Sequence, residues 1–459
     1  MGLRGYYRPN NLQPALFVEY LFSFILNNKQ KHIVVVGAGP GGLTAAMLLG
    51  ARGFRVTLVE KDSTLGGRNA AIDLNGYKFD TGPTFLMMKF ILDEVFEEAG
   101  RASDDYLDFV KLEPMYRLAF DQATVEPTTD HAAMREQIAR VFPGNEEGFD
   151  RFLEKEQVRY DKMYPCLQKD YTSLSRYFSK EMIRALPHLG LGKSVMDILK
   201  GYFDEDELRL AFTFQSKYLG MSAWECPGAF AMLPFVEHAH GIYHTQGGLS
   251  EISEAMAKVC REYGVEIRLN SPVKELVLEG RAVKGVELES GEVIHADETV
   301  LNADFGYAME HLVPKGVLKK YRPEKLRNMD FSCSTFMLYL GLDKVYDLPH
   351  HTIFFAKNYR QNIEDVFQYK KLSDEISFYV RNASVTDPNL APEGHSAVYV
   401  LVPVPNLTAE VDWAAEKEAF REKVLQAMET KGEMTDLRDH IQEEMVLAPD
   451  DWEAKGIYQ

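Results

Sequence analysis

Cysteine is scarce in this sequence, and the few cysteines are too scattered to define a metal or disulfide site. Cys166, Cys226, Cys260 and Cys333 form no C-x-x-C pair, the spacing typical of paired metal ligands and redox cysteines. Such usage is typical of a chain kept in a reducing cytoplasm. We therefore predict a cytoplasmic protein without a metal site.

Positive charge is also scarce. The 459 residues carry 51 lysines and arginines against 69 aspartates and glutamates, a formal net charge of −18 at pH 7. A nucleic acid partner calls for basic patches, so we expect no nucleic acid partner. The chain is too long for one ordinary core, and two or three domains are expected.

The sequence has no apolar run long enough to cross a membrane as a helix. The nearest candidate, PALFVEYLFSFIL from Pro14 to Leu26, is interrupted by Glu19 and is too short. It lacks a small-residue cleavage site, so a signal peptide is not predicted. Two interpretations stay open for residues 1–30: a helix that contacts a membrane interface, or an extension that packs on the protein or is partly disordered.

Clusters that mark hydrolytic or metal chemistry are also missing. The sequence shows no nucleophilic triad and no obvious carboxylate pair. EHAH, from Glu237 to His240, contains metal-ligand types, but on the strand that we expect there, Glu237 and His238 would point to opposite faces. PHHT, from Pro349 to Thr352, is predicted to be a turn rather than a site. The sequence therefore assigns no catalytic residue.

What the sequence does contain is a dinucleotide-binding pattern, KHIVVVGAGPGGLTAAMLLGARGFRVTLVE. The apolar run from His32 to Val36 predicts a strand buried on both faces. Gly37, Gly39 and Gly42 follow in the G-x-G-x-x-G register, and an apolar helix then leads to a second strand, Val56 to Val59. This order of strand, turn, helix and strand predicts a bound dinucleotide.

Each part of the pattern has a physical role. Gly37 permits the tight turn, Gly39 lets the main chain approach the pyrophosphate, and Gly42 lets helix and strand pack closely. The start of the helix offers free N–H groups to the phosphates. Glu60, about twenty residues beyond the glycines, can accept hydrogen bonds from a ribose. The predicted cofactor-binding residues of this motif are Gly37, Ala38, Gly39, Gly41, Gly42, Glu60 and Lys61.

A second glycine pair, in LVEKDSTLGGRNAA, favours FAD over NAD. Gly66 and Gly67 would let the main chain run against a cofactor that extends past its adenosine half, and Arg68 could lie near its phosphates. A nicotinamide site has little use for another close backbone approach there. The alternative is a surface turn with a solvated arginine.

These residues resemble a known family. VVVGAGPGGLTAAMLLGARGFRVTLVEKDSTLGGRNA and YKFDTGPTFLMM are similar to the flavoprotein amine-oxidase and carotenoid-desaturase superfamily, most of all to its bacterial-type phytoene desaturases. The resemblance continues in FQSKYLGMSAWECPGAFAMLPFVEHAHGIYHTQGGLSEISEAMAKV and in SFYVRNASVTDPNLAPEGHSAVYVLVPVPNL, and it covers the chain from about His32 to its end. The later blocks are specific to the desaturase branch.

The resemblance implies an α/β fold: a Rossmann-like FAD-binding domain of the split two-dinucleotide-binding flavoprotein type, with an α+β substrate domain. The expected divisions are an N-terminal extension that is a candidate for membrane contact (1–30), FAD-binding parts (31–100 and 241–329), a helical substrate and membrane part (101–240) and a second substrate part (330–459).

The sequence itself supports the second FAD-binding part. GGLSEISEAMAKVCREYG predicts a helix from Ser250 that stops at Gly264. A short strand from Val265 to Leu269, a β-meander and a closing strand of the main sheet, Thr299 to Leu301, are predicted to follow.

Two further site assignments rest on the resemblance alone. It places Val273 against the adenine end of FAD, and Gly82, Pro83 and Thr84 of DTGPTFL near the flavin ring. The family normally ends in a glycine-rich block that completes the flavin pocket, and this chain stops at DDWEAKGIYQ before any such block. We therefore expect a truncated chain or a fragmentary gene, with weakened flavin affinity.

The function implied is FAD-dependent desaturation of phytoene or a related carotenoid in carotenoid biosynthesis, by hydride transfer to the flavin. The alternatives are a carotenoid isomerase or oxidase, another flavoprotein acting on a polyene, and an inactive remnant. Expected partners are a long apolar polyene and the membrane surface in which it dissolves; no oligomeric state is predicted.

Aromatic and methionine side chains, each of ordinary core type, collectively suit an apolar tunnel: Phe212, Phe214, Tyr218, Trp224, Phe230, Met232, Phe235, Phe336 and Met337.

Overall fold

The computed structural model describes residues 31–457, which fall into two compact units. Each unit combines separate stretches of the chain: the first contains residues up to Ala70, Asp93–Tyr106 and Ile252–Leu326, and the second contains Ala71–Leu92, Leu107–Glu251 and the chain from Arg327 on. The apolar segment from Pro14 to Leu26 lies outside the described residues. Among residues 31–457, no helix combines the length and the apolar character needed to span a bilayer. The expected domain boundaries stay predictions.

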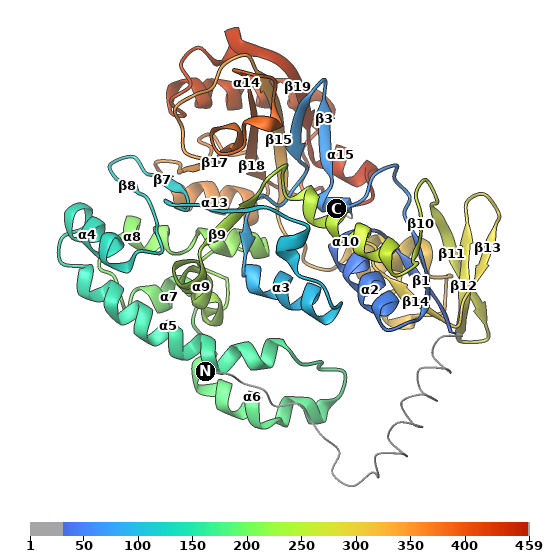
Figure 1. The fold of residues 1–459 in the computed structure, drawn as a ribbon. Coiled ribbons are helices and arrows are strands. Elements are labelled where there is room, and N and C mark those ends of the chain that lie inside the picture. Colours follow the sequence, from blue (N-terminus) through green and yellow to red (C-terminus); the bar gives the residue numbers. More distant parts are fainter. Residues whose placement is uncertain (1–30, 458–459) are drawn as a thin grey trace. The chain divides into compact units, whose positions relative to one another are not determined.

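A four-stranded parallel sheet forms the centre of the first unit. Its strands, in spatial order, are β10 (Glu266–Arg268), β2 (Arg55–Val59), β1 (His32–Val36) and β14 (Glu298–Leu301). Every residue of β1 is buried, as its continuous apolar run predicts. Helix α2 (Pro40–Ala51) connects β1 to β2, and α10 (Ser250–Glu262) precedes β10 (Figure 1). Two distant parts of the sequence thus form one sheet, which confirms the split Rossmann-like domain.

The predicted β-meander is confirmed as a separate antiparallel sheet. It consists of β11 (Val273–Glu279), β12 (Ala282–Leu288) and β13 (Val293–His295), drawn in yellow in Figure 1. Its apolar side chains share a core with β1, β2 and the short helix α11 (Phe305–Tyr307) with the π-helical turn Ala308–Leu312. The meander therefore covers one side of the nucleotide-binding sheet.

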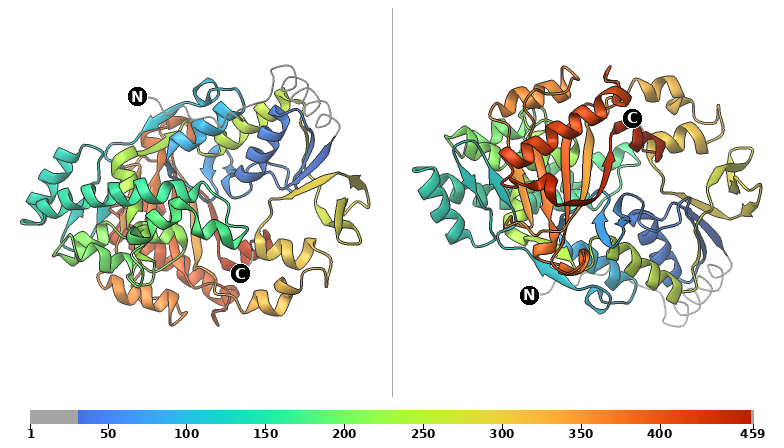
Figure 2. Two further views of the ribbon diagram at one scale, coloured as in Figure 1. Left: turned by 90° about the horizontal axis from the view of Figure 1, so that it is seen from below. Right: turned by 90° about the horizontal axis from the view of Figure 1, so that it is seen from above.

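A seven-stranded sheet forms the centre of the second unit. Its strands, in spatial order, are β19 (Ile441–Leu447), β15 (Ser334–Leu342), β18 (Ser396–Val404), β17 (Phe378–Asn382), β16 (His351–Phe354), β7 (Arg117–Ala119) and β8 (Thr124–Val125). Helix α14 (Trp413–Thr430) runs across one face (Figure 2, right). That face is apolar: Phe336, for example, packs against the rings of Trp413 and Phe420. Neighbouring residues of β15 alternate to the opposite face.

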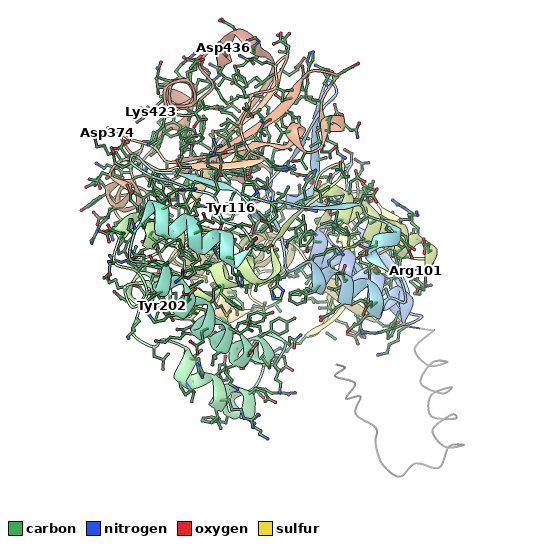
Figure 3. The ribbon with its side chains drawn as sticks, turned by 60° about the vertical axis from the view of Figure 1, so that its left-hand side comes forward. Arg101, Tyr116, Tyr202, Asp374, Lys423 and Asp436 are labelled. Carbon is green, nitrogen blue, oxygen red and sulfur yellow. The ribbon has the colours of Figure 1, made fainter. Side chains whose placement is uncertain are left out.

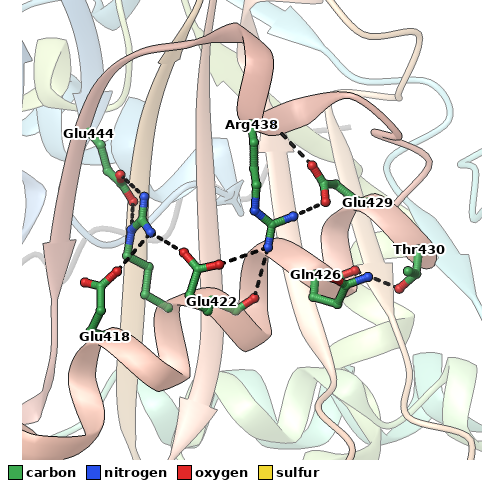
Figure 4. Close-up of polar contacts among 8 residues, drawn as sticks. Glu418, Glu422, Gln426, Glu429, Thr430, Arg438 and Glu444 are labelled. Atoms are coloured by element: carbon green, nitrogen blue, oxygen red, sulfur yellow. Dashed lines mark hydrogen bonds and ion pairs between the residues drawn. The ribbon is translucent and has the colours of Figure 1, made fainter.

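Ion pairs hold α14 against the edge strand β19. Arg421 makes two contacts with the carboxylate of Glu444, at 2.6 and 2.5 Å. Arg438, in the turn before β19, lies between Glu422 and Glu429 of α14 (Figure 4). A bidentate arginine–carboxylate pair fixes orientation as well as distance, so these contacts set the position of an otherwise exposed sheet edge.

Two smaller sheets complete the β-structure of the second unit. A hairpin of β3 (Ala71–Leu74) and β4 (Tyr77–Asp80) leads to a sheet of β5 (Leu86–Met87), β9 (Ile242–Thr245) and β6 (Phe109–Lys111). The helices are α3 (Lys89–Glu98, shared between the units), α4 (His131–Val141), α5 (Glu146–Leu167), α6 (Lys180–Ala185), α7 (Val195–Leu199), α8 (Asp206–Ala211), α9 (Met232–His240), α12 (Pro323–Arg327, also shared), α13 (Tyr359–Phe367) and α15 (Pro449–Ala454). This mixture gives the predicted α+β character.

The helices between residues 131 and 240 enclose an apolar core. The strand predicted for EHAH, in this part of the chain, is wrong. EHAH lies in α9, not in a strand. Glu237 and His238 are both buried, because α9 is enclosed on most sides. For the same reason its sequence lacks the alternation of polar and apolar residues that would distinguish a helix from a strand. Tyr116, labelled in Figure 3, donates a hydrogen bond to Glu237 Oε2 at 2.7 Å. His238 Nδ1 lies 2.9 Å from the carbonyl of Thr128.

The residues expected to line a tunnel occupy several cores. Phe212 packs in the helical core against Phe152 and Phe203, whereas Phe336 belongs to the core beneath α14. Met337 lies on the opposite face of the same strand. The side chains of Phe214 and Tyr218 lie outside the described part of the structure. The tunnel stays a prediction.

Candidate cofactor-binding site

The turn after β1 lies at the point where the order of the strands in the sheet reverses. From β1 the chain goes through α2 to β2 on one side, and β14 returns on the other side. In doubly wound sheets ligands bind at this point, beyond the carboxyl ends of the strands. Gly37 follows β1 with φ +95°, and a Cβ there would lie 2.5 Å from the carbonyl oxygen of Asn302. The turn therefore requires glycine at this position.

The third glycine of the motif allows α2 to begin directly at this turn. A Cβ on Gly42 would lie 1.9 Å from the carbonyl oxygen of Gly37, which no side chain can tolerate. Helix α2 starts at Pro40, which has no N–H to leave unpaired. The amides of Gly41 and Gly42 fall in the first turn, where the helix itself offers no acceptor. They are available to an anion such as a pyrophosphate.

Gly39 differs from its neighbours because the protein fold does not require glycine there. Its φ is −69°, an ordinary value for any residue. A Cβ would make only van der Waals contacts, at 3.6 Å to Asn302 Nδ2 and 3.8 Å to the carbonyl oxygen of Gly66. The missing side chain thus leaves space for a group outside the protein, in the place where the motif predicts a close approach of the pyrophosphate.

The second glycine pair packs on the first motif. Gly66 donates its N–H to the carbonyl of Ala38 at 2.9 Å. Gly66 and Gly67 have φ values of +104° and +53°, and a Cβ on Gly67 would lie 3.5 Å from the Cα of Gly39. The two glycine motifs therefore form one cradle, with main-chain atoms on both sides.

The acidic residue of the motif is fixed at the same place. Glu60 is 5% exposed and accepts hydrogen bonds from the N–H groups of Ala38 at 2.7 Å and Asp62 at 3.0 Å. Each carboxylate oxygen keeps further acceptor capacity, as a ribose would require. Lys61 is exposed and pairs with Asp62 at 2.9 Å.

Arg68 is paired with an acidic side chain. Its Nη2 lies 2.5 Å from Asp304 Oδ2, and 60% of the Arg68 side chain is exposed. Asp304 also caps α11 through the N–H of Tyr307. The structure thus places Arg68 just beyond β14, next to the glycine cradle in sequence but engaged with Asp304.

Sequence reasoning missed Asn302. It follows β14, and its N–H donates to the carbonyl of Val36 at 2.8 Å. A Cβ added to Gly41 would lie 2.7 Å from the side-chain Oδ1 of Asn302, and a Cβ added to Gly42 would lie 3.0 Å from its Nδ2. A side-chain amide offers both donors and an acceptor at the centre of the cradle. The available signal was its position directly after the closing strand of the sheet.

The two remaining assignments lie apart from the glycine cradle in the sequence. Val273 begins β11, where it pairs with Leu288, and is partly buried. Gly82, Pro83 and Thr84 belong to the second unit, in the loop between β4 and β5. Of these three residues only Pro83 is exposed.

PHHT contains a buried polar group rather than a simple turn. His351 begins β16, so the predicted turn is wrong. The strand is buried on both faces, and its sequence therefore lacks the alternation of polar and apolar residues that indicates a strand. His350 and His351 are buried, and burial together with the charge of Arg381 holds the pKa of each imidazole well below its usual range. Both rings are therefore neutral at physiological pH. Within residues 31–457, no three His, Cys, Asp or Glu side chains are grouped so that they could hold a metal ion.

The glycine cradle, the fixed carboxylate of Glu60 and the start of α2 together fit a dinucleotide. Comparison with protein families agrees: residues 40–459 match the model of the flavin-containing amine oxidoreductases, and the chain belongs to this family. It is an FAD-dependent oxidoreductase, which confirms the prediction of FAD.

Curated relatives narrow the class to carotenoid desaturases. The chain is 52% identical over 423 residues to a 4,4′-diapophytoene desaturase (4,4′-diapolycopene-forming) of a Methylomonas species, across 92% of this chain and 83% of the relative. It is 36% identical to an all-trans-zeta-carotene desaturase of Myxococcus xanthus, across 92% of this chain and 81% of that one. A neurosporene-forming phytoene desaturase of Rhodobacter capsulatus is 34% identical, with coverages of 91% and 81%.

Solved structures support the same fold at low sequence identity. A protein of Pyrococcus furiosus has a TM-score of 0.60 at 16% identity and covers 91% of this chain and 88% of its own. A putrescine oxidase variant has a TM-score of 0.55 at 14% identity, with coverages of 93% and 85%. The predicted fold class is confirmed.

The geometry around Gly39 predicts that binding can be removed without unfolding the protein. In Gly39→Val the added side chain occupies the cradle at an ordinary φ, so we expect FAD retention to fall at least tenfold while the thermal unfolding of the FAD-free protein is unchanged. Gly42→Ala is the contrasting variant, because its Cβ meets the Gly37 carbonyl and should destabilise the unit itself. Flavin absorbance after gel filtration and circular dichroism melting measure the two effects. Full flavin retention in Gly39→Val would contradict the assignment.

Proposed function

We propose that the protein desaturates phytoene, 4,4′-diapophytoene or a related carotenoid precursor. The glycine cradle carries this proposal, because it fits a dinucleotide cofactor and because the fold itself does not require glycine at position 39. The 52% identity to a 4,4′-diapophytoene desaturase supports the substrate class.

When bound, FAD supplies the oxidising power, since it accepts a hydride from an allylic carbon of the polyene. Loss of a proton from the neighbouring carbon would complete the double bond, and an external electron acceptor would be needed for further turnovers. The protein has to hold an unactivated C–H bond beside the flavin and exclude water. Such a reaction needs no nucleophile and no metal, in keeping with the residues of the cradle.

We assign the FAD contacts to both glycine motifs, the flanking acidic and basic residues, the loop after β4 and the first residue of β11. The assigned residues are Gly37, Ala38, Gly39, Gly41, Gly42, Glu60, Lys61, Gly66, Gly67, Arg68, Gly82, Pro83, Thr84 and Val273, and the geometry of the cradle adds Asn302. Lys61 and Arg68 would contribute after exchange of their present carboxylate partners.

We also propose peripheral contact with a membrane, through the segment from Leu167 to Lys193 around α6. Leu174, Phe178 and Leu191 are 81%, 76% and 76% exposed, and exposed apolar side chains that gather in one segment mark protein or membrane interaction sites. The segment carries five basic and two acidic residues in a chain of net charge −18. An apolar surface with a local positive charge suits an anionic bilayer, from which a dissolved polyene could be taken.

Product analysis tests the catalytic proposal. Cells that accumulate phytoene or 4,4′-diapophytoene should form carotenoids with a longer conjugated system when they express this chain, and cells with the Gly39→Val variant should not. Chromatography with absorbance spectra of the extracted pigments is the measurement. An unchanged number of double bonds with altered geometry would favour an isomerase, and newly oxygenated products would favour an oxidase. No change in cells whose protein carries FAD would contradict the proposal.

Vesicle binding tests the membrane surface. We expect Leu174→Ser, Phe178→Ser and Leu191→Ser together to weaken binding to phosphatidylglycerol-containing vesicles by roughly tenfold or more, because three large apolar side chains no longer enter the interface. The control replaces three other exposed apolar residues, Val345, Tyr369 and Val385, by serine. Co-sedimentation measures the bound fraction. Equal binding by the two triple variants would contradict the assignment.

A further inference from the structure

Three tyrosines of the seven-stranded sheet lie beneath the loop that joins β4 to β5. Tyr339 on β15 and Tyr399 on β18 are direct cross-strand partners, and Tyr379 on β17 lies on the same face. Tyr339 and Tyr399 are buried, and Tyr379 is partly buried. Their rings contact one another edge to face: the centroids of Tyr339 and Tyr399 are 5.5 Å apart, and those of Tyr379 and Tyr399 are 5.8 Å apart.

Each of the three hydroxyl groups bonds to a different residue of the loop. Tyr339 donates to the carbonyl of Thr81 at 2.6 Å, and Tyr399 donates to the carbonyl of Gly82 at 2.9 Å. The hydroxyl of Tyr379 lies 2.8 Å from Thr84 Oγ1. Burial raises the pKa of all three phenols, so they stay protonated and able to donate.

Further buried groups fix the start of the loop. The carboxylate of Asp80 lies 2.8 Å from Arg381 Nη1, and both side chains are 2% exposed. Asp80 Oδ1 also accepts a hydrogen bond from the N–H of Ser250 at 3.3 Å. A second guanidinium nitrogen of Arg381 lies 3.3 Å from His244 Nδ1. The buried ion pair thus anchors the residue directly before the loop.

The far end of the loop is held in the same way. His351 Nδ1 lies 2.6 Å from the hydroxyl of Tyr379, which in turn contacts Thr84. The imidazole ring stacks on Phe85 with centroids 4.1 Å apart. His351 thereby fixes the orientation of the Tyr379 hydroxyl, and Phe85 fixes the residue after Thr84.

This network is more elaborate than packing of the sheet requires. The opposite face of the same sheet is covered mainly by apolar side chains, Phe336, Leu338 and Leu340 among them. Burying hydroxyl and charged groups costs free energy unless every group is paired, and this face uses them to fix one short loop. The loop has a buried underside, while Pro83 at its tip is exposed. It is therefore held rigidly from below and presents its tip outward.

We propose that Tyr339, Tyr379 and Tyr399 are positioning residues that fix the main chain of Thr81 to Thr84 as a surface of the flavin-binding site. This inference rests on the proposed assignment of Gly82 to Thr84 to the flavin. A peptide group held at a set orientation beside the ring acts as a fixed dipole, and such dipoles tune the electronic properties of a bound cofactor. Loss of one hydroxyl should loosen the loop and alter the bound flavin.

The test uses the full chain with each tyrosine changed to phenylalanine, which keeps the ring and removes only the hydroxyl. Tyr346→Phe is the matched control: this buried tyrosine of the same unit donates to Asp436 at 2.7 Å and has no contact with the loop. Hydrogen–deuterium exchange of residues 81–87 is measured without FAD, and the visible spectrum and midpoint potential of the flavin are measured with FAD.

We expect exchange in this segment to be roughly fivefold faster or more in Tyr339→Phe, Tyr379→Phe and Tyr399→Phe, the factor that corresponds to one lost buried hydrogen bond. The control should behave as the unchanged protein. The flavin spectrum or potential should shift in the three variants only. Should one variant not fold, the other two carry the test.

Exchange equal to that of Tyr346→Phe would overturn the inference. Faster exchange with an unaltered flavin would also overturn it, because the loop would then be positioned for another purpose. If the protein without substitutions takes up no FAD, the proposed function is contradicted instead. The exchange measurement would still decide whether the three hydroxyl groups position the loop.

Discussion

The contact between Gly42 and Gly37 is the constraint on which the cofactor site depends. Because a side chain at Gly42 would collide with the Gly37 carbonyl, α2 can begin directly at the end of β1 only with glycine there. This close start brings the unpaired amides of the first helical turn to the switch point of the sheet. Asn302 reaches the same point from β14. The affinity for an anionic dinucleotide thus follows from a packing requirement of the fold.

The second glycine pair extends this cradle beyond the adenosine half of the cofactor. Gly66 bonds to Ala38, and Gly67 lies against Gly39, so a loop that follows the ribose-binding acid returns to the first motif. A simple surface turn would not require this return. The close contact explains why two glycine motifs occur in tandem, and it agrees with membership of a flavin-containing family.

Local sequence patterns predicted the first unit well, because its parallel strands are continuous apolar runs and its turn has a strict glycine register. Asn302 and the three tyrosines were not predictable in this way. Asn302 gains its place when β14 returns beside β1, and the tyrosines meet through the register of three strands distant in sequence. The helix α9 and the strand β16 were wrongly predicted because burial on most sides removes the periodicity that distinguishes helix, strand and turn.

We propose that the polyene gives its hydride to FAD held in this cradle. A single turnover, in which the FAD-loaded protein is mixed with phytoene or 4,4′-diapophytoene in the absence of oxygen and any other electron acceptor, tests this transfer. We predict that the visible absorbance of the oxidised flavin is lost in step with the appearance of the new double bond, one flavin for each bond. A new double bond formed while the flavin stays oxidised throughout would contradict the claim.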